Sequence, residues 1–232
     1  MEINLRHYEG FAVAAADTSL EATRLRTWCL TQDVHVPIYN AYAPELVPYG
    51  SVEWCETALG HHVQPDYYPL WLWPQLHRKV WRSQTWELGC RLFVKPADAY
   101  KRFDGFVTTG TYKKKKKGPY WWSEVVGFID EWRYYVSAGV VAAAAWYQGE
   151  NEDAPAPALE IELPQWYNGA LDFGRLKDGD LALVEAQHPF ACGWYGDGIE
   201  PYLQWIIDGW KYMTDAVPAP IKTPLKSVAT TK

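Results

Sequence analysis

Two short apolar runs joined by a turn constrain this chain more than any other stretch. The first run is Leu171-Asp172-Phe173-Gly174, and the second extends over residues 181–187. Residues 177–180 between them have the sequence Lys-Asp-Gly-Asp, which is typical of a turn, so the pattern predicts an antiparallel hairpin. Because residues 181–184 are all apolar, the second strand is expected to be buried on both faces.

Polar residues stand where this second strand ends. Side chains alternate along a strand, so Glu185 and Gln187 should share one face with Leu181 and Leu183, and Asp172 on the first strand can join them. A carboxylate at the end of a buried strand needs a partner or a metal, and oxygen ligands of this kind suit Mg²⁺. The alternative interpretation is that Glu185 is an ordinary surface carboxylate.

Composition limits the function classes. The chain of 232 residues is 48% hydrophobic and is therefore expected to be globular. Its net charge of −6 argues against nucleic-acid binding by the whole surface, although its 14 Trp and 16 Tyr residues can fill a core, line a cleft or stack on bases. No signal peptide or membrane helix is recognised, and the scattered cysteines predict reduced thiols in a cytosolic protein: Cys29, Cys55, Cys90 and Cys192.

Strands are expected to outnumber helices, with hairpins in the middle of the chain, which favours the α+β class. Helices are predicted at residues 19–30, with Ser19 as the cap, and at 76–86 and 199–213. Residues 61–74, rich in proline and aromatic residues, are expected to form a boundary loop. The predicted strands are 34–39, 51–54, 91–96, 106–109, 121–129, 132–136 and 140–147.

Several basic residues have both a structural and a functional interpretation. Lys95 either marks the exposed end of an edge strand or holds a phosphate as a point charge, and Lys101 is either a loop lysine or its partner. Glu131 and Arg133 form either a surface ion pair or a site in which Arg133 reaches a phosphate or carboxylate. The run Lys113–Lys117 is either a solvated loop or a mobile one that closes over phosphates or attracts an acidic partner.

Taken in order, these segments resemble the ATP-grasp superfamily, over residues 45 to 215 approximately. More narrowly, they look like a small phage and bacterial clade that is marked by one arginine and two lysines. The segments that carry the resemblance are Phe93-Val94-Lys95-Pro96, Lys101 to Phe106, Glu124-Val125-Val126, Glu131-Trp132-Arg133, Leu171 to Gly174 and Glu185-Ala186-Gln187.

The resemblance implies an ATP-grasp fold in which two α+β subdomains clasp ATP, preceded by a small N-terminal α/β region. The expected limits are 1–70 for that region, 71–217 for the ATP-grasp domain and 218–232 for a flexible tail. The implied roles are Lys95 on the phosphates, Glu124, Val125 and Val126 as the adenine hinge, Glu131 near the ribose, and Asp172, Glu185 and Gln187 as Mg²⁺ ligands. Arg133 would lie by the transferred phosphate or the acceptor carboxylate. Arg78, preferred to Arg91, would be the clade's arginine, and Lys95 and Lys101 its two lysines.

The implied activity is that of an ATP-dependent carboxylate–amine ligase. A small-molecule or peptide carboxylate would attack ATP to give an acyl phosphate and ADP, and an amine would then form the amide. The expected location is the cytoplasm, the host's if a phage encodes the chain. Two departures from the family, Gln187 in place of the usual Asn and a missing glycine-rich phosphate loop, keep an alternative open: a non-catalytic module that binds a nucleotide, a protein partner or, less favoured, a nucleic acid.

Overall fold

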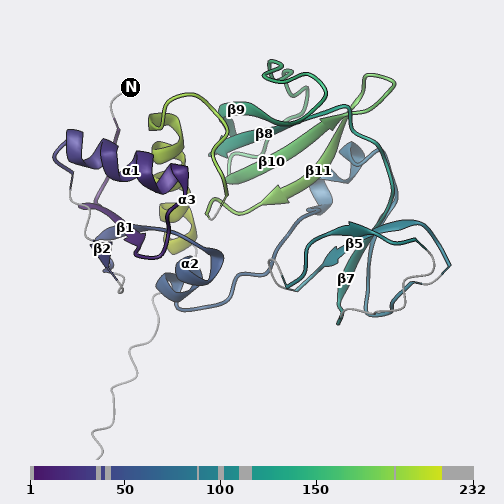
Figure 1. The fold of residues 1–232 in the computed structure, drawn as a ribbon, viewed down its shortest axis with the longest axis horizontal. Helices are drawn as coiled ribbons and strands as arrows, with labels where there is room; N and C mark the ends of the chain where they lie inside the picture. Colours follow the sequence, from purple (N-terminus) through teal and green to yellow (C-terminus); the bar gives the residue numbers. More distant parts are fainter. Residues whose placement is uncertain are drawn as a thin grey trace, which may run out of the picture.

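A computed structural model gives the structure of residues 3–34, 38–39, 43–87, 89–98, 102–109, 117–190 and 192–215. The described chain contains a parallel sheet near the N-terminus and two antiparallel sheets after it (Figure 1). The parallel sheet has the order β2-β1-β3, and the antiparallel sheets have the orders β4-β7-β5-β6 and β11-β10-β8-β9. The predicted α+β class is thereby confirmed.

The first part of the chain is a small α/β unit. Its strands are β1 (Gly10–Ala14), β2 (Ile38–Tyr39) and β3 (Leu46–Tyr49), and its helices are α1 (Leu20–Thr31) and α2 (Val52–Leu59). The predicted cap is confirmed, because the Ser19 side chain accepts a hydrogen bond from the Ala22 backbone N–H at 3.1 Å. The strand predicted at 51–54 is wrong, since Ser51 caps the N-terminus of α2 instead. Of the strand predicted at 34–39, only residues 38–39 are a described strand; residues 35–37 lie outside the description.

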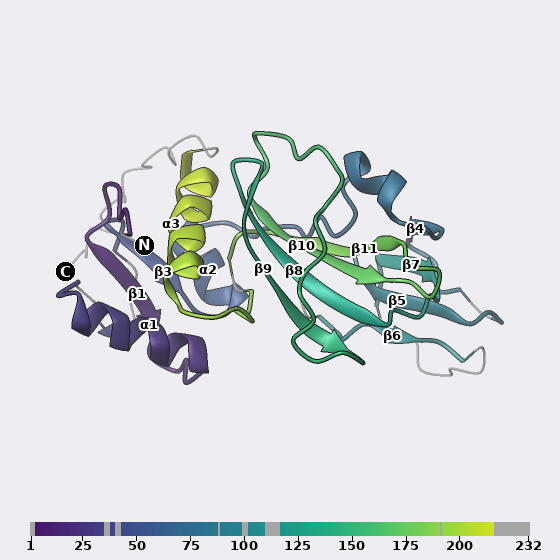
Figure 2. The ribbon, with the colours of Figure 1, turned by 90° about the horizontal axis from the view of Figure 1, so that it is seen from above.

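The last helix, α3 (Glu200–Asp215), packs into the same core as this unit. Phe11 of β1, Leu25 of α1 and Ile207 of α3 are fully buried together. Figure 2 shows α3 between the N-terminal strands and the sheet that contains β8 and β9. The Trp205 indole N–H is shared between the backbone oxygens of Val136 and Gly169, at 3.1 and 3.2 Å, which fixes α3 to that sheet.

The smaller antiparallel sheet contains β4 (Val80–Ser83), β5 (Leu92–Pro96), β6 (Phe106–Val107) and β7 (Tyr120–Glu124). The helix predicted at 76–86 is wrong. Residues 70–75 form a 3₁₀ helix, η1, and residues 80–83 pair antiparallel with β7, with Trp81 opposite Trp122. Pairing with a strand 40 residues away in the sequence thus outweighs the local helical preference.

The larger antiparallel sheet contains β8 (Asp130–Ser137), β9 (Val140–Gly149), β10 (Gly169–Arg175) and β11 (Leu181–Gln187). The predicted hairpins β8–β9 and β10–β11 are confirmed. The strand predicted at 121–129 is too long, because β7 ends at Glu124 and residues 125–129 connect the two sheets.

A β-bulge in the last hairpin corrects the predicted side-chain alternation. Asp172 lies opposite Glu185, but the next residue, Phe173, lies opposite Leu183, so Val184 is an extra residue in β11. The bulge reverses the alternation. Leu183 belongs to the core beneath the sheet, whereas Glu185 faces the polar side chains of the opposite face; the prediction that they share a face is wrong.

The four cysteines are described, and all are free thiols. Within the described ranges, no helix is long and apolar enough to span a bilayer.

Candidate functional site

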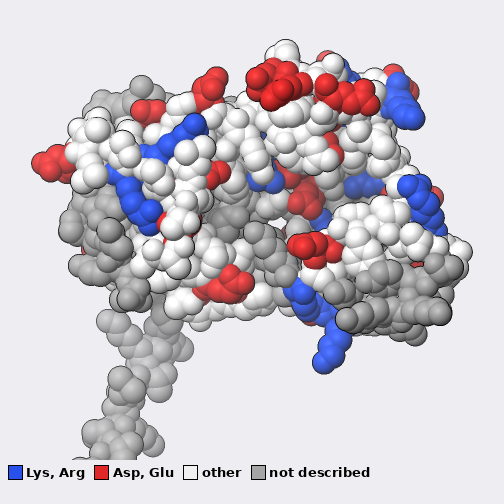
Figure 3. Space-filling view, in the orientation of Figure 1, with Lys and Arg blue, Asp and Glu red and all other residues white. Residues whose placement is uncertain are grey.

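A cavity of about 280 Å³ lies where the two antiparallel sheets meet. Lys95 of β5, Glu131 of β8 and Glu185 of β11 line it, together with the connecting residues Val125 and Val126. On the face shown in Figure 3, acidic and basic side chains gather near the middle of the molecule, between its N-terminal part and the smaller antiparallel sheet. This cavity is a cleft with both positive and negative side chains in its wall.

Lys95 and Glu185 form an ion pair that joins the two sheets across this cleft. Lys95 is only 5% exposed, and its Nζ lies 3.4 Å from the ring centroid of Tyr67 and 4.7 Å from that of Tyr68. β5 lies between β7 and β6, so it is an interior strand. The interpretation of Lys95 as the exposed end of an edge strand is therefore wrong.

Arg133 and Asp172 form a second buried pair, on the neighbouring strands β8 and β10. The guanidinium donates from Nε and Nη2 to the two carboxylate oxygens, each at 2.8 Å, in the bidentate geometry that is strongest for this pair. The Tyr147 and Tyr195 rings flank Arg133, with centroids 5.6 and 5.2 Å from Cζ. The alternative of a surface ion pair with Glu131 is wrong; Glu131 instead accepts from the Tyr147 hydroxyl at 2.6 Å.

Gln187 connects the two pairs. Its Nε2 donates to Glu185 at 2.5 Å and lies 3.5 Å from Asp172, while its Oε1 accepts from the Cys192 thiol at 3.1 Å. Asp172, Glu185 and Gln187 therefore converge on one face, as the sequence predicts. The described residues contain no cluster of three or more His, Cys, Asp or Glu side chains for a metal, so a cation here would be held by two carboxylates and an amide oxygen. That hard oxygen set fits Mg²⁺, provided that the Gln187 amide turns its oxygen inward.

The pKa values of the carboxyl groups in this cluster shift in opposite directions. Burial raises the pKa of Glu185, but the charge and hydrogen bond of Lys95, together with Arg133 and Gln187, outweigh burial, and the pKa is lowered overall. Burial also raises the pKa of Asp172 and outweighs the opposing effect of Arg133. Burial raises the pKa of Glu131 as well. Glu185 is thus the carboxylate that the cluster holds most firmly in its ionised form.

Arg78 lines the cavity and is held by the backbone of β11. It donates to the carbonyl oxygens of Leu183 and Val184 at 2.6 and 3.0 Å, and its Cζ lies 5.7 Å from the Phe128 ring centroid. Arg91, the less favoured candidate for the clade's arginine, is exposed. The catalytic role of Arg78 stays a prediction.

The adenine-hinge residues lie at the end of β7. The Glu124 carboxylate accepts from the backbone N–H of Lys79, the residue before β4, at 2.9 Å. Val125 and Val126 follow the last ladder pair and line the cavity with Glu124. Lys101 and residues 113–116 of the lysine run lie outside the described residues. The tyrosine rings beside Lys95 and Arg133 were not predicted; the only signal for them in the sequence is its high Trp and Tyr content.

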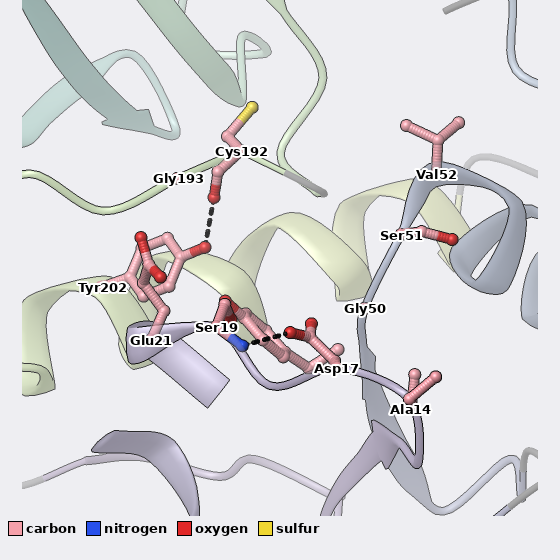
Figure 4. Close-up of a pocket in the computed structure, with 12 residues that line it drawn as sticks. Ala14, Asp17, Ser19, Glu21, Gly50, Ser51, Val52, Cys192, Gly193 and Tyr202 are labelled. Atoms are coloured by element: carbon pink, nitrogen blue, oxygen red, sulfur yellow. Dashed lines mark hydrogen bonds between the residues drawn. The ribbon is translucent and has the colours of Figure 1, made fainter. Parts of the chain in front are cut away.

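A second cavity, of about 460 Å³, lies between the N-terminal unit and the segment of Cys192 and Gly193 (Figure 4). It lies at the carboxyl ends of β1 and β3, where Asp17 accepts from the Ser19 backbone N–H at 2.9 Å. Cys192 and Gly193 separate it from the charged cluster, and the Gly193 carbonyl accepts from Tyr135 at 2.6 Å. Arg133 Nη1 lies 3.5 Å from the same oxygen.

Comparison with known proteins connects this geometry to a family. The model of an ATP-grasp domain family, the second family of the clade named for one arginine and two lysines, matches residues 75–205, more than half of the chain. A solved structure of the ATP-grasp ligase PsnB, complexed with a minimal precursor, aligns with a TM-score of 0.37 and 14% identity. The alignment covers 59% of this chain and 55% of that one, so it spans only about half of that ligase. No curated protein matches the sequence.

Proposed function

The chain belongs to the ATP-grasp superfamily, in the second family of the one-arginine, two-lysine clade, and from this premise we propose that it is an ATP-dependent carboxylate–amine ligase. Members of this superfamily are ATP-dependent ligases in general. The finer proposal is that a carboxylate takes the γ-phosphoryl group of ATP, and that an amine then displaces phosphate from the acyl phosphate. The products are an amide, ADP and phosphate.

The observation that carries the proposal is the two ion pairs, Lys95–Glu185 and Arg133–Asp172, which Gln187 connects. Lys95 comes from the smaller sheet, whereas Arg133, Asp172 and Glu185 come from the larger one, so the cluster exists only where the two sheets meet. Lys95 and Glu185 of this cluster line the cleft, so a bound triphosphate with its metal would meet a fixed cation and a carboxylate there.

In this mechanism the residues bind and orient the reactants. Lys95 holds the α- and β-phosphates, Val125 and Val126 offer backbone groups to adenine, and Glu131 lies near the ribose. Asp172, Glu185 and Gln187 would hold Mg²⁺, which supplies charge neutralisation for the phosphates when bound. Arg133 stabilises the transferred phosphoryl group or the carboxylate that receives it.

The cavity behind Cys192 and Gly193 is the place we propose for the second substrate. It is lined by Gly193, whose carbonyl oxygen lies 3.5 Å from Arg133 Nη1, and it is large enough for a small molecule or the end of a peptide. The proposed domain limits, residues 1–70 and 71–217, make this cavity an inter-domain site. Arg78 and Lys101 remain proposed catalytic residues, with Lys101 the second lysine of the clade.

The decisive experiment measures ADP formation by the full chain with ATP and Mg²⁺ against a panel of amino acids and short peptides. Dependence of ADP release on both a carboxylate and an amine, with the amide product identified by mass spectrometry, is the expected result. Nucleotide binding without ADP release for any acceptor, and without loss of binding in Glu185→Gln, would instead favour the non-catalytic module.

A further inference from the structure

An aromatic pocket of about 410 Å³ lies outside the nucleotide cleft, beside η1 and the end of β11. Among the described lining residues, Tyr68 alone lines both this pocket and the cleft. Its ring contacts Lys95 from the cleft, 4.7 Å from the ammonium, and packs edge-on against Trp121 of the pocket at 5.2 Å. The pocket is therefore a neighbour of the cleft: the two share Tyr68, and Gln187, which donates to Glu185 of the cleft, also lines the pocket.

Three rings form a corner in this pocket. Trp71 and Trp166 have centroids 6.0 Å apart and planes at 81°, and Tyr167 lies 5.2 Å from Trp71 at 64° and 6.2 Å from Trp166 at 79°. Rings with steeply inclined planes present faces and edges to the same space. The faces carry negative quadrupole potential, which attracts ammonium and guanidinium groups.

The charge of the lining favours a cation as well. Asp66 is the only carboxylate among the lining residues that the structure describes, and none of these residues is Lys or Arg. An anionic ligand would meet Asp66 without a compensating cation.

The rim is apolar and open to solvent. Leu70 is 76% exposed, Trp166 56%, Trp73 44% and Tyr212 38%, although large apolar side chains are usually exposed singly. These four residues surround one pocket, so the exposed apolar surface is continuous with the aromatic corner. A small amine would leave this rim uncovered, whereas an extended peptide that carries a cationic side chain would cover it.

We propose that this aromatic pocket binds a lysine or arginine side chain presented by an extended peptide segment of a partner protein. The side chain enters the corner of Trp71, Trp166 and Tyr167 with its charge near Asp66, and the flanking peptide lies on Leu70 and Trp73. This binding is independent of ATP turnover.

The test follows the indole N–H resonances of the ¹⁵N-labelled full chain by NMR, without nucleotide. The probe is the acetylated, amidated peptide Ala-Ala-Lys-Ala-Ala, and its control carries norleucine, an uncharged side chain of similar length, in place of lysine. The lysine peptide is expected to shift the Trp71 and Trp166 resonances saturably, and the norleucine peptide to leave them unchanged. Equal binding of both peptides, or no binding of either, would overturn the proposal.

Variants of the full chain locate the site. Trp166→Ala is expected to weaken peptide binding about tenfold, and Trp166→Phe, which keeps a ring, by less, as expected for one cation–π contact. Asp66→Asn should weaken binding and flatten its salt dependence. Leu30→Ala, at an exposed position on α1, is the matched control and should change nothing.

Another occupant would be detected in the same spectra. The chain itself contains Lys222 and Lys226 in its proline-containing C-terminal residues. If replacing both lysines by Ser shifts the pocket indole resonances without any peptide, the occupant is this segment of the chain, and the proposal of a partner protein is wrong.

Discussion

Asp172 and Glu185 lie directly opposite each other on β10 and β11, and each is neutralised by a cation from a different strand. Like charges at opposed positions of a sheet repel each other. Arg133 on β8 neutralises Asp172, and Lys95 from the other sheet neutralises Glu185. Neutralisation of Glu185 therefore depends on contact between the two sheets, whereas that of Asp172 is built into the larger sheet.

Removing one member of the Lys95–Glu185 pair is expected to destabilise the protein more than removing both. Glu185→Leu leaves the Lys95 ammonium buried without a carboxylate, which should cost about 2–3 kcal/mol of unfolding free energy, less than for a pair with both partners buried. The double variant Lys95→Met/Glu185→Leu should recover most of this loss. Urea unfolding of the unsubstituted chain, of Lys95→Met, of Glu185→Leu and of the double variant measures the coupling free energy between the two residues. Additive effects of the two substitutions would contradict the pairing.

Arg133→Lys is expected to lower both stability and turnover. A lysine cannot make the two parallel hydrogen bonds that Arg133 donates to Asp172, so the loss should be about 1–3 kcal/mol, with ADP formation reduced at least tenfold by the proposed role. Arg175→Lys is the matched control. Arg175 is 35% exposed and reaches Asp130 through one nitrogen, which a lysine can replace, so this substitution should cost less than Arg133→Lys and leave turnover intact. Equal effects of both substitutions would argue against a special role for Arg133.

Asp130 is expected to make stability depend on pH under acidic conditions. Burial raises its pKa, but hydrogen bonds from Asn151 and from Arg175 lower it by more, so that the pKa falls to about 2. In the unfolded chain this carboxyl has a pKa of about 3.9. The contribution of ionised Asp130 to the free energy of unfolding is therefore complete above about pH 4 and is lost as the pH falls toward 2. Thermal unfolding of Asp130→Asn should show lower stability at neutral pH and a flatter profile in this window. A profile as steep as that of the natural chain would assign the effect to other groups.

The sequence predicted those elements that are marked by residues next to them in the chain, such as a helix cap, a turn or a proline. Ser19 caps α1, the turn at 177–180 joins β10 to β11, and β5 ends at Pro96, next to Lys95, as expected. The strand at 80–83 could not be predicted in this way, because its partner β7 lies far along the chain.

The site was predicted in its residues but not in its geometry. Nothing in the residues around Val184 signals a bulge, yet this extra residue turns Glu185 toward Asp172 and away from Leu183. The pairing of Arg133 with Asp172 depends on the register of β8 against β10, which a single sequence does not reveal. The roles of the site residues stay predictions.

ATP with Mg²⁺ is expected to raise the melting temperature of the full chain, corresponding to about 1–3 kcal/mol at saturating ligand. The part due to the metal should depend on Gln187, whose amide lies between Glu185 and Asp172. Gln187→Asn restores the residue usual in the family and keeps an amide oxygen, so a metal-dependent shift should persist. Gln187→Leu has no oxygen ligand and should show the same shift with and without Mg²⁺.

Differential scanning fluorimetry with ATP alone, Mg²⁺ alone and both separates these outcomes. A full Mg²⁺-dependent shift in Gln187→Leu would remove Gln187 from the ligand set, and no shift in the unsubstituted chain at millimolar ATP would contradict nucleotide binding itself.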